Sequence, residues 1–160
     1  MMEIDPTTVC PCGSQSSYAT CCAPIHAAPA RASTPEALMR ARFSAFVLAD
    51  SDFLIASWAP DTRPMRAELE GSGEDSGPRW RRLIVAASEN DDDHGWVRFR
   101  ALAQQADGWL ALEETSRFRR IDGQWFYLDG DADWQRLRVG RNAPCPCGSG
   151  LKAKRCCARG

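Results

Sequence analysis

The chain has 160 residues, of which 44% are hydrophobic and 26% charged, and its formal net charge is -1 at pH 7. These values are typical of an ordinary globular domain with short appendages, and they exclude a broad electrostatic field that would draw the whole chain to nucleic acid or membrane. No apolar run approaches the roughly 20 residues that span a bilayer, and the acidic N-terminus lacks the apolar core of a secretory signal. We therefore expect a cytoplasmic protein, in which clustered cysteines indicate metal ligands more often than disulfides.

The first predicted element is a cysteine module over residues 1–28, with the pattern C-P-C-G-S-x6-C-C. Two close pairs of thiolates joined by a short loop can surround one tetrahedral cation. A disulfide between adjacent cysteines would need a strained ring, and buried free thiols would not need the same spacing twice. The pattern therefore predicts a four-sulfur metal site, in which His26 lies near enough to replace one sulfur, although a surface histidine is the simpler expectation. The predicted ligands are Cys10, Cys12, Cys21 and Cys22.

A central domain is predicted over residues 33–134. All six Trp and all six Phe lie between Phe43 and Trp134, so the large apolar core is expected in this part of the chain alone. A capping hydroxyl followed by Pro35 indicates a helix start, and apolar residues at helical spacing continue this helix to Ala49. Two shorter helices are expected over residues 52–58 and 63–70, with a loop over 71–78.

The apolar period changes to two after residue 80, which indicates strands. The predicted strands cover residues 80–88, 95–106, 109–120 and 124–129. Hairpin turns are expected at Asp107-Gly108 and Asp122-Gly123. Helices followed by an antiparallel meander predict an α+β domain.

Polar side chains on a core-facing strand mark a possible pocket in this domain. Glu114 and Ser116 share a strand face with Leu112, so they must be paired or line a cavity. Arg42, on the first helix of the domain, is a candidate partner for Glu114, and Arg117 lies close in sequence. A structural ion pair, or a bulge that reverses the strand's parity, would explain the same pattern without a ligand.

A second cysteine module is predicted over residues 139–160, with identical spacing. A closed cage of four sulfurs leaves no coordination position for water, so each site is expected to hold structure and not to activate a nucleophile. An all-sulfur tetrahedron suits zinc, and it also suits a single iron, so two zinc sites are expected with iron as the alternative. The predicted ligands are Cys145, Cys147, Cys156 and Cys157.

The two modules differ in charge. The last 20 residues contain no acid, whereas the first 28 contain two acids and no Lys or Arg. We expect the C-terminal module to be a basic knob on a flexible stalk that meets an acidic partner or a phosphate backbone. A merely solubilising role for these cations is the alternative. The candidate partner-binding residues are Arg141, Lys152, Lys154 and Arg155, together with Arg159.

Residues 139–150, continued to Cys157, resemble the zinc-binding tail of the SecA translocation motor, known as the SEC-C motif. In SecA this tail binds zinc and contacts the export chaperone SecB and the ribosome. The SecA motif usually ends in Cys-His, whereas Cys157 occupies the final ligand position here. The resemblance implies a zinc site and a protein partner of this kind.

The whole chain resembles the YchJ family, bacterial proteins that place a SEC-C motif at one or both ends of a nuclear-transport-factor-two-like domain. This resemblance implies a cone of helices packed on a bent four-stranded antiparallel sheet, flanked by two small zinc-knuckle modules. It implies no established activity. The N-terminal motif departs from the pattern at Gln15, where glycine is usual. The matching segments are 10–14, Tyr18, 21–22, 39–43, 116–118 and 122–125.

Four functions are compatible with these features, of which RNA binding by the C-terminal module and zinc delivery or iron sensing are the weaker two. The first is a zinc-binding cytosolic adapter, whose basic C-terminal module docks on an acidic partner such as an export chaperone or the ribosome. It needs no membrane, and ribosomal RNA is the one nucleic acid expected. The alternative is a small-ligand binder or enzyme that uses the cone pocket. The sequence contains no Cys-His dyad, glycine-rich phosphate loop or open metal triad, so no catalytic residue is predicted.

Overall fold

The computed structural model describes residues 3–66, 68 and 78–157 of the chain. Its longer elements are two helices and four strands, and short helical turns accompany the cysteine modules. In chain order the elements are η1 (Tyr18–Thr20), α1 (Ala23–Ala27), η2 (Pro29–Arg31), α2 (Pro35–Leu48), α3 (Ser51–Ala56), β1 (Arg79–Asn90), β2 (His94–Gln105), β3 (Gly108–Ile121), β4 (Gln124–Leu137) and η3 (Ala153–Arg155).

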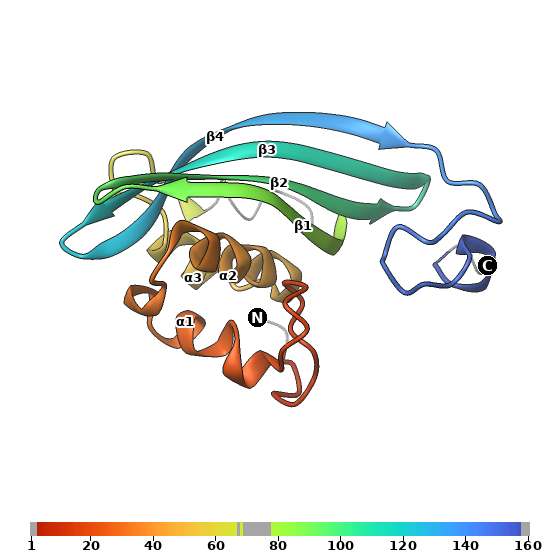
Figure 1. The fold of residues 1–160 in the computed structure, drawn as a ribbon, viewed down its shortest axis with the longest axis horizontal. Coiled ribbons are helices and arrows are strands. Elements are labelled where there is room, and N and C mark those ends of the chain that lie inside the picture. Colours follow the sequence, from red (N-terminus) through yellow and green to blue (C-terminus); the bar gives the residue numbers. More distant parts are fainter. Residues whose placement is uncertain (1–2, 67, 69–77, 158–160) are drawn as a thin grey trace.

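The four strands form one antiparallel sheet in the order β1-β2-β3-β4, which confirms the predicted meander. The sheet is long and bent, and the helices lie against one side of it (Figure 1). Register shifts interrupt the pairing of β1 with β2 and of β3 with β4, and such bulges increase local twist and bending. Asp122 and Gly123 both have positive φ, as a two-residue hairpin turn requires. The other hairpin turns one residue earlier than predicted, because Gly108 already belongs to β3.

Helix α2 begins and ends where the sequence predicted. The Thr34 hydroxyl accepts a hydrogen bond from the Ala37 N–H at 3.1 Å, and Ala49 ends the helix in the left-handed conformation. Asp50 caps α3 in the same way, and this helix is shorter than the predicted span 52–58. Of the predicted third helix over 63–70, the structure describes residues 63–66 and 68, of which 63–65 are not helical and 66 and 68 are. The predicted loop lies outside the described residues except for Pro78. No helix among the described residues is long and apolar enough to cross a membrane.

The main core lies between α2 and the inner face of the sheet. Apolar residues of α2, such as Leu38 and Ala41, belong to the same buried cluster as Val97, Phe118 and Trp125 of the sheet. The expectation that this core is confined to the middle of the chain is wrong. The cluster also contains three cysteines of the N-terminal module, because that module packs on α2 rather than standing apart. These cysteines are Cys10, Cys12 and Cys22.

Strand β4 continues eight residues beyond the predicted end at Asp129. The segment is acidic, which in sequence resembles a solvated loop. The structure pairs two of these acids with Arg117, whose Nε and Nη1 lie 2.6 and 2.8 Å from Asp129 and Asp131. Opposite charges across the ladder and a glycine at 130 let this acidic segment remain a strand.

The C-terminal module packs against the sheet. The expectation that it stands on a flexible stalk is therefore wrong. Cys145 belongs to a small buried cluster with Leu102, Trp109 and Ala111, at the end of the sheet where β2 meets β3. Figure 1 shows this segment folding back beside one end of the sheet. The two modules therefore belong to different buried clusters of the same protein.

Candidate metal centres

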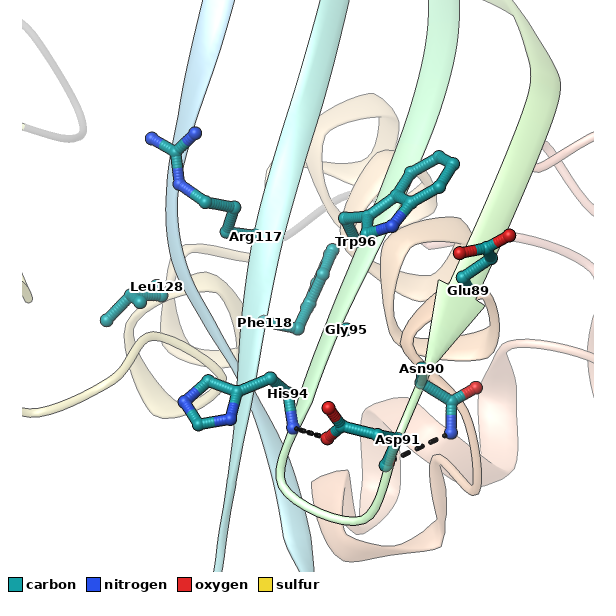
Figure 2. A pocket seen from close by; sticks show the side chains of 9 residues that line it. All are labelled: Glu89, Asn90, Asp91, His94, Gly95, Trp96, Arg117, Phe118 and Leu128. Carbon is teal, nitrogen blue, oxygen red and sulfur yellow. Dashed lines mark hydrogen bonds between the residues drawn. The ribbon is translucent and has the colours of Figure 1, made fainter.

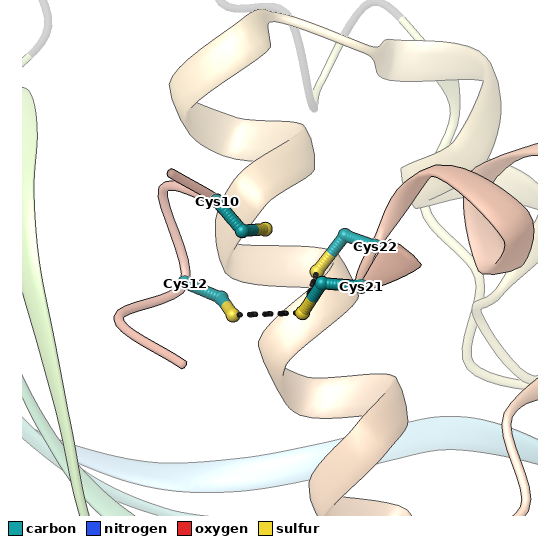
Figure 3. Close-up of side chains that lie close together, drawn as sticks. All are labelled: Cys10, Cys12, Cys21 and Cys22. Carbon is teal, nitrogen blue, oxygen red and sulfur yellow. Dashed lines mark hydrogen bonds between the residues drawn. The ribbon is translucent and has the colours of Figure 1, made fainter. Parts of the chain in front are cut away.

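The N-terminal quartet brings its four sulfurs within 4.8 Å of one another. Cys10 and Cys12 come from a loop, while Cys21 and Cys22 directly precede α1, and all four side chains point to a common centre (Figure 3). The Cys12 and Cys21 sulfurs are 3.5 Å apart, and those of Cys21 and Cys22 are 3.9 Å apart.

The C-terminal quartet has the same construction. Its sulfurs also lie within 4.8 Å of one another, with 3.4 Å between Cys147 and Cys156 and 3.9 Å between Cys156 and Cys157. In each module a short bridge closes the loop around the first cysteine pair, and a single 3-10 turn precedes the second pair. Gly13 and Gly148 occupy equivalent positions and share a φ of 84°. The sequence repeat is therefore a structural repeat.

These distances fit a tetrahedral thiolate site. Four sulfurs at about 2.3 Å from one ion are about 3.8 Å apart, close to the separations in both quartets. All eight cysteines are free thiols, and both members of each adjacent pair belong to their cluster. Each quartet can thus hold one metal ion. All four positions are filled by sulfur, so neither site offers an open position for a substrate.

The N-terminal quartet is mostly buried, and a hydroxyl group contacts two of its sulfurs, while Arg40 donates to the Cys12 carbonyl at 2.9 Å. Ser44, on α2, has its hydroxyl 3.5 Å from the Cys10 sulfur and donates to the Cys22 sulfur at 3.4 Å. His26 is neither a ligand nor a surface residue. It is half-buried, its Nδ1 lies 2.7 Å from the Tyr18 hydroxyl, and its Nε2 lies 2.7 Å from the Ala41 carbonyl.

The surroundings of the C-terminal quartet are more open and carry a positive charge. Arg81, from β1, donates to the Cys157 sulfur at 3.3 Å, and Ser149 donates to the Cys156 sulfur at 3.3 Å. Three of the four cysteines are only half-buried. The cysteine motif in the sequence does not indicate that Arg81 or Ser44 contacts a sulfur, because both residues lie far from their quartet along the chain.

Neighbouring hydrogen-bond donors lower the pKa of one thiol of this quartet. Burial works to raise the pKa of Cys147, but hydrogen bonds from Ser149, Cys156 and Cys145 together outweigh it, so this pKa falls to about 6. Burial raises the pKa of Cys157 to about 12, although Arg81 opposes that increase. Capture of a cation, which favours thiolates, would therefore release protons chiefly from thiols such as Cys157.

The candidate partner-binding residues lie on the outside of the C-terminal module. Arg141, Lys152 and Arg155 are exposed and Lys154 is half-buried. Arg159 is outside the described residues. The exposed side chains of Arg79, Arg81 and Arg82, at the start of β1, add to the basic residues of this end of the molecule.

The four pocket residues do not share one site. Arg42, Glu114 and Ser116 line a cavity between α2 and the sheet. The predicted direct ion pair of Arg42 with Glu114 is not formed, because Arg42 instead donates to the Leu54 carbonyl at 2.9 Å and the Ser57 hydroxyl at 2.7 Å.

Arg117 is separate from these three residues. It lines a surface depression beside the β1–β2 hairpin, together with Trp96 and His94 (Figure 2). Alternation along β3 explains the separation, because Arg117 faces away from the side occupied by Glu114 and Ser116.

Family comparisons agree with this architecture. Residues 34–130 match the family described as YchJ, middle NTF2-like domain, and residues 141–159 match the SEC-C motif. A UPF0225 protein of Sodalis glossinidius is 46% identical over 154 residues, which cover 92% of this chain and 96% of that protein. A UPF0225 protein of Photorhabdus laumondii is 41% identical, with 94% and 99% covered.

Two solved structures share the fold. The solution structure of a SEC-C motif containing protein from Rhodopseudomonas palustris is 31% identical and superposes with a TM-score of 0.68, covering 79% of this chain and 99% of that one. The crystal structure of a SEC-C motif containing protein from Psychrobacter arcticus is 29% identical with a TM-score of 0.67, covering 96% and 97%. The chain therefore belongs to the YchJ family, with an NTF2-like central domain between two clusters of four cysteines.

Proposed function

We propose that this protein is a zinc-stabilised interaction module whose basic C-terminal surface docks on an acidic partner. The observation that carries the proposal is the packing of the C-terminal module against β1, which joins two groups of cations distant in sequence. An atom added at Gly148 would lie 3.2 Å from the Arg82 side chain, and Arg81 reaches the Cys157 sulfur. We call this the basic surface; it consists of Arg79, Arg81, Arg82, Arg141, Lys152, Lys154 and Arg155.

The cations of the basic surface have no carboxylate partners among the described residues, and Arg81 alone among them contacts a sulfur. None of its seven cations has a carboxylate partner within the described part of the chain, whereas arginines elsewhere, such as Arg117 and Arg119, are paired. Residues 134–160 contain no Asp or Glu. Unpaired cations held on a rigid module favour binding of an acidic surface and accelerate the encounter with it.

Zinc is the metal that this role favours. A closed four-sulfur site stabilises a small module that has little apolar core of its own, and zinc adds no redox chemistry. A metal-organised module can hold Lys152 and Arg155 in a fixed arrangement. The resemblance to the SecA tail supports an export chaperone or the ribosome as the partner to test first.

Recovery of partners with charge-reversed protein tests this proposal. The variant Lys152→Glu/Lys154→Glu/Arg155→Glu should recover the acidic partner about tenfold less well than the parent protein, and binding by the parent should weaken as salt increases. Purified export chaperone and purified ribosomes should be assayed separately.

The matched control reverses three exposed arginines outside the basic surface, Arg31, Arg98 and Arg120, and so changes the net charge equally. Metal content should be measured for both triple variants, so that a lost partner is not confused with a lost metal. Equal recovery of partners by the two variants, each with its full metal content, would contradict the proposal.

A further inference from the structure

The cavity between α2 and the inner face of the sheet is independent of both metal centres. Its volume is about 260 Å³, equivalent to about nine waters, which is room for one small ring system with a substituent. The walls are mainly aromatic, and aromatic walls suit a planar apolar body. The aromatic residues are Phe43, Phe46, Trp58, Trp80, Tyr127 and Trp134.

A buried cation lies in the wall of this cavity. Arg42 is only 3% exposed, and its guanidinium carbon lies 4.4 Å from the centre of the Tyr127 ring and 4.9 Å from that of Trp58. Burial lowers the pKa of Arg42 to about 10, so the side chain stays charged at neutral pH. Its hydrogen bonds to described residues use Nη1 alone, which leaves Nε and Nη2 without acceptors there.

A carboxylate in the same cavity balances this charge. The buried Ser116 hydroxyl donates to Oε2 of Glu114, which orients the carboxylate. Gly130 on β4 makes room for it, because an added atom there would lie 2.6 Å from Oε2. Glu114 acts on Arg42 through space and stabilises its charged form. The polar wall of the cavity is therefore a cation and an anion whose charges cancel.

A further donor in the cavity wall lacks an acceptor. The Nε1 of Trp58 is buried with no hydrogen-bond partner in the described part of the chain. Buried donors without partners cost free energy, and a bound acceptor would recover it. A charged ligand would disturb the balance between Arg42 and Glu114 in a mainly apolar site, whereas a neutral one would not.

We propose that this cavity binds a small, neutral, planar molecule whose carbonyl oxygen accepts from Arg42 and whose adjacent N–H donates to Glu114. An amide on an aromatic or cyclic body has this chemistry. Ser116 and Gly130 position the carboxylate, and the aromatic residues enclose the ring. This proposal does not depend on the adapter role.

Three probes of nearly equal shape test the proposal: benzamide is neutral, benzoate is an anion and benzylamine is a cation at pH 7. Titrations followed by NMR of the backbone and indole N–H groups locate and measure binding. Benzamide should shift the Trp58 and Trp80 indole signals saturably, and both charged probes should bind about tenfold more weakly. Absence of saturable shifts with benzamide, or equal binding of all three probes, would overturn the proposal.

Two variants separate recognition from folding. Glu114→Gln removes the anion and leaves a net positive site, so it should reverse the preference and bind benzoate more tightly than benzamide; an unchanged preference would contradict the role of Glu114. Leu112→Trp, in the cavity wall, should abolish binding of benzamide while the spectrum of the rest of the protein persists. Undiminished benzamide binding by the filled variant would place the probe elsewhere and refute the site.

Discussion

The two cysteine modules have the same backbone and different neighbours. The N-terminal quartet is part of the main core, where Cys10, Cys12 and Cys22 are at most 2% exposed. The C-terminal quartet packs on a small cluster at one end of the sheet, and only Cys145 is fully buried. One motif thus stabilises the central domain in one copy and holds cations on the surface in the other. The contrast shows that two copies of one cysteine motif can pack in different ways within one protein.

The side chains that contact the sulfurs also differ between the two quartets. A neutral hydroxyl, that of Ser44, touches two sulfurs of the buried quartet. A guanidinium, that of Arg81, touches one sulfur of the exposed quartet. Arg81 places positive charge directly on a sulfur of the exposed quartet, whereas Arg40 donates only to a backbone carbonyl of the buried one, so the sulfurs themselves receive different donors.

The largest difference is expected when equivalent ligands are removed. Cys12→Ala should lower the free energy of unfolding of the central domain by more than about 3 kcal/mol, because it removes a metal ligand and opens a hole in the core. Cys147→Ala should lower it by less than about 1 kcal/mol, because its module is peripheral. Urea denaturation followed by far-UV circular dichroism measures both. Equal losses would mean that the modules do not differ in this way.

Metal release should also distinguish the modules. Because the C-terminal sulfurs are partly exposed, a chromogenic chelator should remove that metal about a hundredfold faster than the other, giving two kinetic phases. Stopped-flow absorbance measures the rates, and Cys147→Ala should delete the fast phase alone. A single phase that accounts for both metals would go against the comparison.

Contacts to the sulfurs should affect only their own site. Ser44→Ala should weaken metal binding by the N-terminal quartet about tenfold, and Arg81→Gln should do the same for the C-terminal quartet, because each removes a donor to a ligand sulfur. Competition with a chelator of known affinity measures each site. An effect of Arg81→Gln on the N-terminal site would contradict the assignment.

The smallest effect concerns backbone strain at one position of the repeat. Gln15 has a φ of 69° where the equivalent Gly150 has 84°. Because a side chain is unfavourable in this left-handed conformation, Gln15→Gly should stabilise its module by about 1 kcal/mol and Gly150→Gln should destabilise the other by a similar amount. Metal-dependent thermal unfolding of each variant measures the change. Destabilisation by Gln15→Gly, or stabilisation by Gly150→Gln, would show that other interactions dominate at this position.

The sequence predicted the local features of this protein well. The cap at Thr34, the hairpin at Asp122 and the shared strand face of Glu114 and Ser116 depend on neighbouring residues, and each is confirmed. The spacing of the cysteines predicted two quartets, which the structure brings together. The resemblance to the YchJ family supplied the arrangement of helices on a bent sheet, and the family comparison confirms it.

The features that sequence did not predict depend on contacts between distant segments. The acidic end of β4 is a strand because Arg117 neutralises it from β3. His26 is held by Tyr18 and the Ala41 carbonyl, and no local pattern indicated that arrangement. The docking of the C-terminal module on Trp109 was missed for the same reason.

The central claim is that each quartet of sulfurs closes around one metal ion. Native mass spectrometry of protein purified under reducing conditions, without added metal, tests it most directly. We predict two zinc ions in each chain, reduced to one by Cys147→Ala. A folded, fully reduced chain whose measured mass equals that of the metal-free polypeptide would contradict the claim.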